Sequence, residues 1–424
     1  MMKDWKEIKL GEIAKVISGF AFKSKDFLKD KGISAIKIKN IKNGNVDLSE
    51  TDFVDNSFLS INQRYHLNRN DILVSLTGSH MTQPNSVVGR VALYRHDFTS
   101  LLNQRAGKVI PNETLIDKKF LYCFLSQDRI KETIAMRANG AANQANVSPG
   151  DVEDLDILLP PLETQQKIAS ILSAYDDLIE NNLRRIKLLE EMAAITYKEW
   201  FVNNSLSNRV INEKEIEFQA IENILDFSMN GGWGKDESEG NDIIPAYVVR
   251  GTDIPNVLKG NFTNLPLRFH SVKNIETREL KYGDVIIEIS NGNINSIGRS
   301  LFCDKDFLKM FNHKVICASF CKMLRAKDNL KSILLDAHIK YLHKTDKMSV
   351  YKSQGANGIN NFRSDEMIKK ENIPFPINRD DLKLLANGLE IFNTLNSNLR
   401  YQNRLLKESR DILLPRLMSG AVVA

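Results

Sequence analysis

The chain has 424 residues, 42% of them hydrophobic and 26% charged, a composition typical of a globular protein with about two to four domains. No apolar run approaches the roughly 18 residues of a membrane-spanning helix, and the first residues lack the apolar segment of a signal peptide, so we expect a cytoplasmic protein that does not bind membranes. The net charge of +5 is uneven: residues 1–110 hold 17 Lys and Arg against 11 Asp and Glu, and residues 111–161 hold 5 against 8, so the first segment suits either a polyanion or a solvated lysine-rich surface.

Short β-like runs come first in chain order and recur in the same order later. They cover residues 35–38, 71–76 and 89–93 in the first copy and residues 246–250, 284–289 and 298–302 in the second. The runs alternate or are briefly apolar, and clusters of Gly, Asn, Asp and Ser separate them, as is typical of strands and turns. Each copy therefore predicts an α/β (α+β) domain with a curled sheet that is rich in antiparallel pairs.

A long stretch with helical periodicity follows each set of strands. The first covers residues 162–203 and the second about 378–419, and at 1.5 Å per residue each helix is about 60 Å long. Both carry an apolar stripe with the spacing of a coiled coil. The first stripe consists of Ile168, Leu172, Tyr175, Ile179, Asn182, Ile186, Leu189, Ala193, Thr196 and Trp200. The second, less strict, consists of Leu384, Ile391, Leu395, Asn398, Leu405 and Ile412, with Leu385, Phe392, Leu399, Leu406 and Leu413 beside it.

Across these junctions the second half of the chain repeats the first at a constant offset of 216. Matching residues include Ser148 and Ser364, Ile157 and Ile373, Pro160 and Pro376, Arg184 and Arg400, and Leu189 and Leu405. A duplicated module predicts an internal pseudo-two-fold axis, which sets the two helices antiparallel. Asn182 and Asn398 occupy equivalent positions near the helix midpoints, so we expect their amides to face each other and fix the helix register, unless they turn to solvent.

No recognisable motif for catalysis, cofactor binding or metal binding accompanies these elements. No strand is followed by a glycine-rich loop of the dinucleotide-binding or Walker type, and neither H-E-x-x-H nor G-x-S-x-G occurs. Residues 372–375 resemble the N-P-P-[YF] motif of amino-methyltransferases, but without a loop for S-adenosylmethionine they are better interpreted as a strand-to-helix junction. The four cysteines have a poor zinc spacing and are interpreted as small buried apolar residues in strands, and the seven histidines show no ligand spacing.

Side chains suited to reading DNA bases concentrate in the loops. Asn and Gln pair with adenine, Arg and Lys with guanine, and Ser and Thr with either, although Asn-rich loops are also ordinary turns. In the first copy the candidate DNA contacts are Lys23, Lys37, Lys39, Ser79, His80, Thr82, Gln83, Asn85, Arg90, Gln104, Arg105, Asn143 and Gln144. In the second copy they are Lys235, Arg250, Asn291, Asn293, Asn295, Arg299, His313, Lys314, Gln354, Asn357 and Asn360.

With these features together, the chain resembles the specificity (S) subunits of type I restriction-modification systems over nearly its whole length. The order is module, helix, module, helix, and the first junction, residues 159–168, is close to the family's PPL-x-x-Q-x-x-I. Further matches are the segment at residues 18–24 and the helix ends at residues 197–201 and 413–420. The second junction departs from the pattern, because residues 375–378 read Phe-Pro-Ile-Asn and no glutamine follows.

The resemblance implies two target recognition domains, at residues 1–161 and 206–377, joined by coiled-coil helices at residues 162–205 and 378–424. Each domain would read one half of an asymmetric bipartite site on double-stranded DNA. The helices would set the spacer between the halves, so that four residues inserted near Lys187 should lengthen it.

The resemblance also implies partners. The helices would dock two methyltransferase (modification) subunits, and restriction/translocase subunits would join the complex. The chain itself would hold no cofactor or metal and perform no catalysis, whereas S-adenosylmethionine, ATP and Mg would belong to the partner subunits. The alternatives are a restriction or methyltransferase enzyme with fused specificity, and a coiled-coil scaffold that binds no DNA.

Overall fold

The computed structural model describes residues 4–42, 44–79, 86–141, 144–203, 205–206, 209–210, 215–355 and 358–422. Its contacts divide the chain into two compact units. Unit 1 comprises Met1–Asp176 and Glu408–Ala424, and unit 2 comprises Asp177–Lys407. Each unit thus contains one repeated module together with one end of each long helix. None of the described helices combines the length and the apolar character that crossing a membrane requires.

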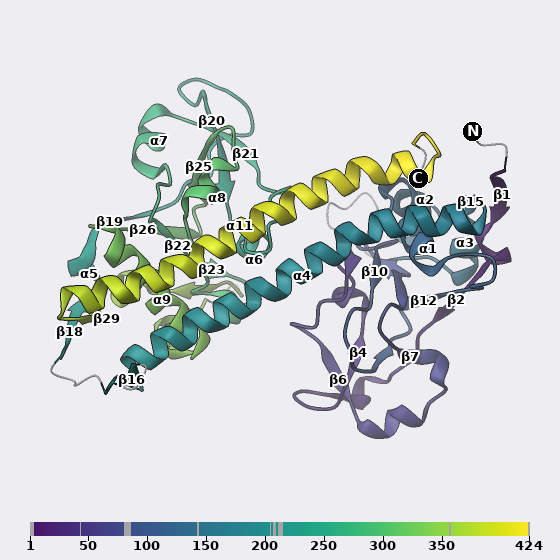
Figure 1. Ribbon diagram of the computed structural model, residues 1–424, viewed down its shortest axis with the longest axis horizontal. Coiled ribbons are helices and arrows are strands. Elements are labelled where there is room, and N and C mark those ends of the chain that lie inside the picture. The colour runs from purple at the N-terminus through teal and green to yellow at the C-terminus, as the bar shows by residue number, and fades with distance from the viewer. Residues whose placement is uncertain are drawn as a thin grey trace. The chain divides into compact units, whose positions relative to one another are not determined.

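Module 1, the globular part of unit 1, contains two small sheets and a β-ribbon. The sheets have the strand orders β2-β12-β8-β10-β5 and β3-β6-β4-β11-β7, and the ribbon is β13-β14-β9. Strand β1 pairs with β15, so the start of the module lies beside its end (Figure 1). The strands are β1 Lys6–Lys9, β2 Ala14–Ser18, β3 Phe27–Leu28, β4 Ile33–Ile36, β5 Gly44–Asn45, β6 Asp52–Val54, β7 His66–Leu67, β8 Ile72–Ser75, β9 Thr77–Gly78, β10 Val91–Leu93, β11 Ser100–Leu102, β12 Ala106–Pro111, β13 Asn139–Ala141, β14 Gln144–Asn146 and β15 Asp156–Leu159. The helices are α1 Lys118–Leu125, α2 Asp128–Met136 and α3 Pro149–Glu153.

Module 2, the globular part of unit 2, repeats this plan. Its sheets have the orders β19-β26-β22-β24 and β21-β20-β25, its ribbon is β23-β28-β27, and β18 pairs with β29 (Figure 1). The strands are β18 Ile216–Ala220, β19 Leu225–Asn230, β20 Ile244–Val249, β21 Leu267–His270, β22 Val285–Glu288, β23 Ser290–Asn291, β24 Ser300–Phe302, β25 Lys314–Cys317, β26 Cys321–Ala326, β27 Lys352–Gln354, β28 Asn360–Phe362 and β29 Asn372–Pro376, preceded by the short pair β16 Ser205–Leu206 and β17 Arg209–Val210. The helices are α5 Ile221–Ile224, α6 Ile254–Val257, α7 Val272–Arg278, α8 Lys305–Lys309, α9 Asn329–Lys344 and α10 Ser364–Lys370.

The central strands β8 and β22 show that the two modules share one backbone frame. In module 1, Ile72 pairs with Leu93 in β10 and with Val109 in β12. In module 2, residue 285 makes the equivalent pairs with residues 302 and 324. The residues of both central strands are buried, as expected for strands covered on both faces. The six strands predicted from the sequence are present, with ends shifted by a residue or two, and the predicted duplication is confirmed.

The two long helices, α4 (Leu162–Phe201) and α11 (Arg379–Met418), pack antiparallel. In unit 1, Ile168 of α4 and Leu417 of α11 belong to one apolar core. In unit 2, Trp200 of α4 shares a core with Leu385 of α11. Asn182 is hydrogen-bonded to Gln402 in unit 2, and Asp176 is paired with Arg410 in unit 1. Residue numbers therefore rise along one helix as they fall along the other, and the numbers of facing residues add to about 585.

The stripe predicted for α4 is confirmed at Ile168, Leu172, Ile179, Ile186 and Trp200, all of which are buried. This face of α4 lies against the modules and against α11, and its burial explains why apolar residues recur there with heptad spacing.

The stripe predicted for α11 is wrong, because its members face solvent. The exposed members are Leu384, Ile391, Leu395, Asn398, Leu405 and Ile412. Leu385 and Leu399, which the prediction placed beside the stripe, are buried instead, as is Leu389. The rotation follows from polar contacts with module 2, where Arg400 donates from Nε to the carbonyl oxygen of Leu258 at 3.2 Å.

The expected pairing of Asn182 with Asn398 is also wrong. Asn182 is buried and donates from Nδ2 to Oε1 of Gln402 at 3.3 Å, whereas Asn398 is exposed. Facing numbers that add to about 585 place residue 403, not residue 398, opposite Asn182. A residue of α4 would face its own repeat equivalent in α11 only at residues 184–185, which are two to three residues after Asn182.

The two junctions use different devices to start their helices. Gln165, in the first turn of α4, is 1% exposed and accepts from Asp117 N at 2.8 Å. Its Nε2 donates to the carbonyl oxygens of Pro160 at 2.8 Å and Leu115 at 3.2 Å. At the second junction the Asn378 side chain accepts from the N–H groups of the first turn of α11 instead. The missing glutamine is therefore replaced by a local cap.

Candidate nucleic-acid interface

In each module the C-terminal end of the central strand meets a ribbon strand and a tight turn. The residue after β8, Leu76, donates from its backbone N to the carbonyl oxygen of Arg105 at 3.0 Å. The residue after β22, Ile289, makes the same bond to Phe320 at 2.9 Å. We call this region the reader edge. It comprises the described residues among 75–78, 90, 104–105 and 139–147 in module 1 and among 288–291, 299, 319–320 and 352–362 in module 2.

A polar link joins the ribbon to the central strand in the same way in both copies. The Thr77 hydroxyl donates to the Asn146 side-chain oxygen at 3.0 Å. In module 2 the Ser290 hydroxyl donates to the Asn361 side-chain oxygen at 3.1 Å. The equivalent hydrogen bonds show that the ribbons occupy the same place in both frames.

An arginine stands at the same frame position in both modules. The backbone N of Ser75 donates to the carbonyl oxygen of Arg90 at 2.9 Å, and that of Glu288 donates to Arg299, also at 2.9 Å. The main chains are equivalent here, so that differences between the two sites arise from side chains.

The side chains around these arginines differ. In module 2, Glu288 is 1% exposed, and Nε and one terminal nitrogen of Arg299 donate to its Oε2 at 3.0 and 2.8 Å. Asn291 donates to the other carboxylate oxygen at 2.6 Å. In module 1 a serine, Ser75, replaces the carboxylate, and burial lowers the pKa of the Arg90 guanidinium, whose Nε is buried without a hydrogen-bond partner. Arg299 is thus held in place by a counter-charge, whereas the described residues supply no such partner to Arg90.

A compensating change accompanies the carboxylate. A Cβ atom on Gly251 would lie 2.2 Å from Oε1 of Glu288, so only glycine leaves room for that side chain. By strand register the equivalent positions in module 1 hold Ile38 in place of Gly251 and Ser75 in place of Glu288. The large side chain therefore stands at one position in module 1 and at the other position in module 2.

The candidate DNA contacts fall into three groups. On or next to the reader edge lie Ser79, Arg90, Gln104, Arg105, Asn291, Asn293, Asn295, Arg299, Gln354 and Asn360, together with the backbone of Gln144. Outside the residues that define the edge lie Lys23, Lys37, Lys39, Lys235, Arg250, His313 and Lys314. His80, Thr82, Gln83, Asn85, Asn143 and Asn357, and the side chain of Gln144, lie outside the described residues.

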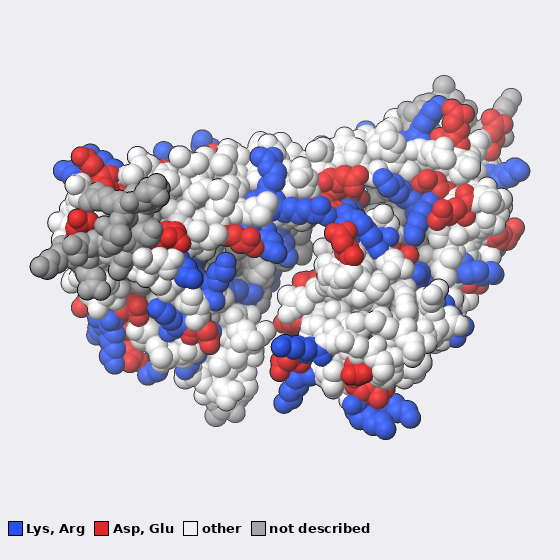
Figure 2. Space-filling view, turned by 60° about the horizontal axis from the view of Figure 1, so that its bottom comes forward, with Lys and Arg blue, Asp and Glu red and all other residues white. Residues whose placement is uncertain are grey.

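Several basic candidates outside the residues that define the edge are in ion pairs. Lys37 and Lys39 contact the Asp52 carboxylate at 3.2 and 2.8 Å. Arg250 contacts Asp253 at 2.8 Å. On the face drawn in Figure 2, basic and acidic residues are interspersed over both units. These pairs favour a structural role for the residues concerned and reduce the positive charge available to a polyanion.

Some candidate asparagines act as turn residues, as the alternative interpretation of the Asn-rich loops anticipates. The Asn291 side chain accepts from Asn293 N at 2.8 Å, and the Asn293 side chain accepts from Asn295 N at 3.0 Å. Asn360 donates to the carbonyl oxygen of Gly292 at 2.9 Å. Their side chains shape the loop after β23, and this role uses part of their hydrogen-bonding capacity.

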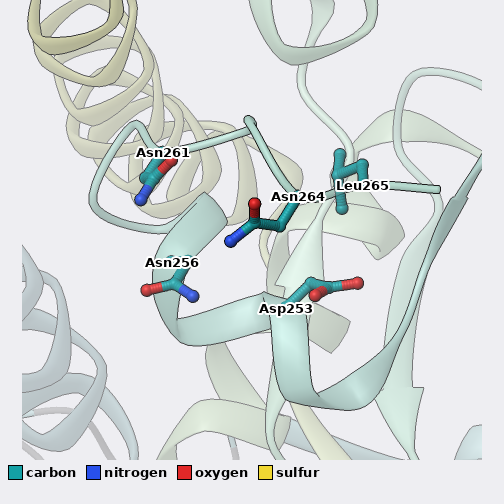
Figure 3. Close-up of a pocket in the computed structure, with 5 residues that line it drawn as sticks. All are labelled: Asp253, Asn256, Asn261, Asn264 and Leu265. Carbon is teal, nitrogen blue, oxygen red and sulfur yellow. The ribbon is translucent and has the colours of Figure 1, made fainter. Parts of the chain in front are cut away.

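Two hollows in module 2 offer alternatives to the reader edge. The smaller, of about 10 Å³, is lined by Asp253, Asn256, Asn261, Asn264 and Leu265, the first two from a helical turn and the others from the loop that passes it (Figure 3). This volume holds about one water molecule.

The larger hollow, of about 490 Å³, has the size of a small-molecule site. Its polar lining includes Lys314, which is paired with Glu279, and His313, whose ring lies 6.0 Å from that of Tyr247. Among the described residues no three His, Cys, Asp or Glu side chains are grouped to hold a metal ion. The hollow therefore presents no recognisable catalytic constellation.

All four cysteines are buried and free, as predicted. Cys317 and Cys321 lie in strands, whereas Cys123 lies on helix α1 and Cys303 directly follows β24. Burial raises the pKa of each thiol, to about 12 at Cys317. These thiols are suited to packing and not to nucleophilic chemistry.

Three edge residues are not among the candidates named from the sequence: Glu288, Ser319 and Phe320. Glu288 lies inside an apolar run, and the other two form a two-residue turn without Asn, Gln or basic residues. An alignment of the two copies at an offset of 215 matches Ser319 and Phe320 with Gln104 and Arg105. Such an alignment could have identified the second turn as a candidate from the sequence.

Two copies of one frame joined to paired antiparallel helices define a class of proteins with two recognition modules. Residues 2–191 match the family described as "Type I restriction modification DNA specificity domain". The putative type I restriction enzyme MjaX specificity subunit of Methanocaldococcus jannaschii is 28% identical over 217 residues, which are 50% of this chain and 49% of that protein. The EcoKI specificity subunit of Escherichia coli K12 is 22% identical, with 69% of this chain and 63% of that protein aligned.

A solved structure extends the likeness in fold to the whole chain. The type I restriction-modification S subunit from M. genitalium superposes with a TM-score of 0.54 at 15% identity and covers 98% of this chain and 96% of that one. Over residues 2–191 the chain is thus similar to the type I restriction modification DNA specificity domain. The findings together support a specificity subunit of a type I restriction-modification system. The aligned region spans about half the length of the Methanocaldococcus relative.

Proposed function

We propose that this chain is the DNA-recognition subunit of a type I restriction-modification complex, and that each module reads one half of an asymmetric, bipartite site on double-stranded DNA. The names of its relatives support this function. The observation that carries it is the pair of reader edges, which have the same backbone and different side chains. Two identical readers would select a palindrome, whereas two different readers select two different half-sites.

DNA binding is tested with the purified full-length chain. Site selection from a random duplex pool should return two short conserved blocks separated by a non-specific gap. If about four phosphates are neutralised, affinity should fall about a hundredfold between 50 and 200 mM salt. Weak binding that is independent of salt, or a single unbroken block, would contradict the proposal and favour a scaffold that binds no DNA.

The paired helices are the proposed docking site for two methyltransferase subunits. Both helices leave apolar side chains exposed although they are packed on other faces. On α11 these are Leu384, Ile391, Leu395, Leu405 and Ile412, and on α4 they are Ile171, Leu178, Leu188, Met192 and Ile195. Exposed apolar side chains at heptad spacing along a helix are typical of a protein interface.

Substitution of one exposed apolar residue tests the docking. Ile391 is 57% exposed, so Ile391→Glu should leave folding unchanged and abolish co-purification with a co-expressed modification subunit. Thr394→Glu, at an exposed polar position of the same helix, is the matched control. Equal co-purification of the two variants would place the interface elsewhere.

We assign no catalysis to this chain and place S-adenosylmethionine, ATP, Mg and the restriction/translocase activity on partner subunits in the cytoplasm. Equilibrium dialysis of the isolated chain against labelled S-adenosylmethionine tests this assignment. Retention of the label would favour the alternative of an enzyme with fused specificity.

The spacer length is proposed to follow from the helices. Facing numbers that add to about 585 indicate that insertions must be paired, and Asp177 and Glu408 mark the matching points where the compact units divide. Near Lys187 an insertion would disturb the packing of α4 on module 2. One heptad added after Asp177 and one before Glu408 lengthen each helix by about 10 Å and keep its faces, so that the gap should grow by about three base pairs. Methylation mapping that returns the original gap would exclude this role.

A further inference from the structure

The turn between β25 and β26 places an aromatic side chain in solvent on the reader edge of module 2. Phe320 is 63% exposed, although its side chain is large and apolar. The turn is closed by a hydrogen bond from Cys321 N to Ala318 O at 2.8 Å, and Phe320 O accepts from Ile289 N at 2.9 Å. The backbone that carries the ring is therefore fixed on two sides.

Module 1 has the same turn with different side chains. Ala106 N donates to Asn103 O at 2.9 Å, and Arg105 O accepts from Leu76 N at 3.0 Å, so Arg105 occupies the frame position of Phe320. Its neighbour in the turn is Gln104, and both are exposed. The two modules thus present Gln and Arg at this turn in one copy and Ser and Phe in the other.

Single exposed apolar residues are common on protein surfaces and often have no role. Phe320 differs from them because its backbone is fixed and because its equivalent is an arginine, a side chain that reads base edges. It also adjoins Ile289, which leads into β23 and Asn291. These observations place it within a polar, solvent-facing edge and not over an incomplete core.

We propose that Phe320 recognises an A·T pair in the half-site of module 2 by contacting the 5-methyl group of thymine. This inference rests on the proposed DNA-recognition function. Because the frames are equivalent, Phe320 and Arg105 approach their half-sites in the same way. In the major groove, where arginine reads guanine, the apolar group displayed by a base pair is the thymine methyl. The carbons of the ring bury this methyl without any polar partner.

Replacement of thymine by deoxyuridine isolates this contact, because it removes the methyl group and leaves base pairing unchanged. After the bipartite site has been identified, each thymine of the second half-site is replaced in turn and the affinity of the full-length chain is measured. One replacement should weaken binding about fourfold, the amount expected for one buried methyl group. Phe320→Ala should weaken binding to the original site and abolish the effect of that replacement, and Phe320→Leu should retain part of it.

Arg105→Ala is the matched control, because it alters the equivalent turn of module 1. Its affinity loss should be independent of deoxyuridine in the second half-site. An equal methyl effect in wild type and Phe320→Ala would overturn the inference, as would a Phe320→Ala variant with wild-type affinity. Failure of the wild-type chain to select any DNA site would refute the proposed function itself, which is a separate outcome.

Discussion

Gly251 and Glu288 are predicted to be energetically coupled. The added methyl group of Gly251→Ala would lie 2.2 Å from Oε1 of Glu288, where ordinary contacts exceed 3.4 Å, so the carboxylate must move. It would then leave Arg299 and Asn291, which donate to it at 2.8 and 2.6 Å. Separating a buried ion pair costs about 3–5 kcal/mol, and because the Arg299 side chain is 25% exposed we expect roughly 2–3 kcal/mol.

Removal of the carboxylate should have the same cost and relieve the overlap. Glu288→Ala is expected to destabilise unit 2 by roughly 2–3 kcal/mol, and Gly251→Ala should add little in that background. The double variant is therefore expected to lose roughly 2–3 kcal/mol and not the sum of about 5, which gives a coupling energy of about 2 kcal/mol.

Urea unfolding followed by tryptophan fluorescence can measure this coupling in the full-length chain. Of the three tryptophans, Trp5 packs on the core of unit 1, and Trp200 and Trp233 lie in unit 2. Trp5→Phe therefore provides a background in which fluorescence reports on unit 2. Gly292→Ala is the matched control, because a Cβ there meets no atom within 4 Å and should change stability by less than about 0.5 kcal/mol.

An additive double variant would refute the reasoning. It would mean that the glycine and the carboxylate contribute independently and that the cost of Gly251→Ala arises in the main chain.

Three further predictions concern the rest of the chain. Gln165→Leu should lower the stability of unit 1 by roughly 3 kcal/mol, because it leaves one N–H and two carbonyl groups unpaired, and the loss should be visible in the fluorescence of Trp5 in a chain without the other tryptophans. The four thiols should not react with a thiol reagent at pH 8 until urea unfolds the chain, because burial raises their pKa; fast reaction of any of them in the native state would contradict their burial. Glu371 Oε1 lies 3.4 Å from His338 Nε2, and Glu371 accepts a hydrogen bond from the Tyr351 hydroxyl. These two contacts hold the pKa of Glu371 below its ordinary value of 4.5. The contribution of this carboxylate is therefore complete above pH 4.5 and lost as the pH falls through the lowered pKa, so the stability of Glu371→Gln should fall less steeply than that of wild type below pH 4.5.

Features set by local periodicity were predictable from the sequence. The central strands could be located because Ile72 and its neighbours form a short apolar run between turn residues, and the start of α4 because two prolines precede it. The duplication could be recognised because the same order of runs occurs twice. These features depend on neighbours in the chain, which a sequence displays directly.

Features set by distant contacts were not predictable in the same way. The heptad pattern of α11 permits two neighbouring faces, and the choice between them depends on polar contacts such as that of Arg400 with the carbonyl of Leu258. The position opposite Asn182 depends on the helix register, which the symmetry of the repeat alone does not fix. Glu288 resembles a misplaced charge in an apolar run until Arg299 and Gly251 are seen around it.

The exchange of Ile38 and Ser75 for Gly251 and Glu288 bears on how two different readers can share one frame. Either change alone would leave a void or an overlap, since a Cβ on Gly251 and the Glu288 carboxylate cannot occupy the same space. The exposed turn carries no such constraint, because its backbone is held by main-chain hydrogen bonds that any side chain permits. Buried edge positions therefore have to change in pairs, whereas positions 105 and 320 can change singly. A change in half-site specificity is accordingly expected to be easiest at these turn residues, and an exchange of Arg105 and Phe320 should preserve stability while it alters the bases selected.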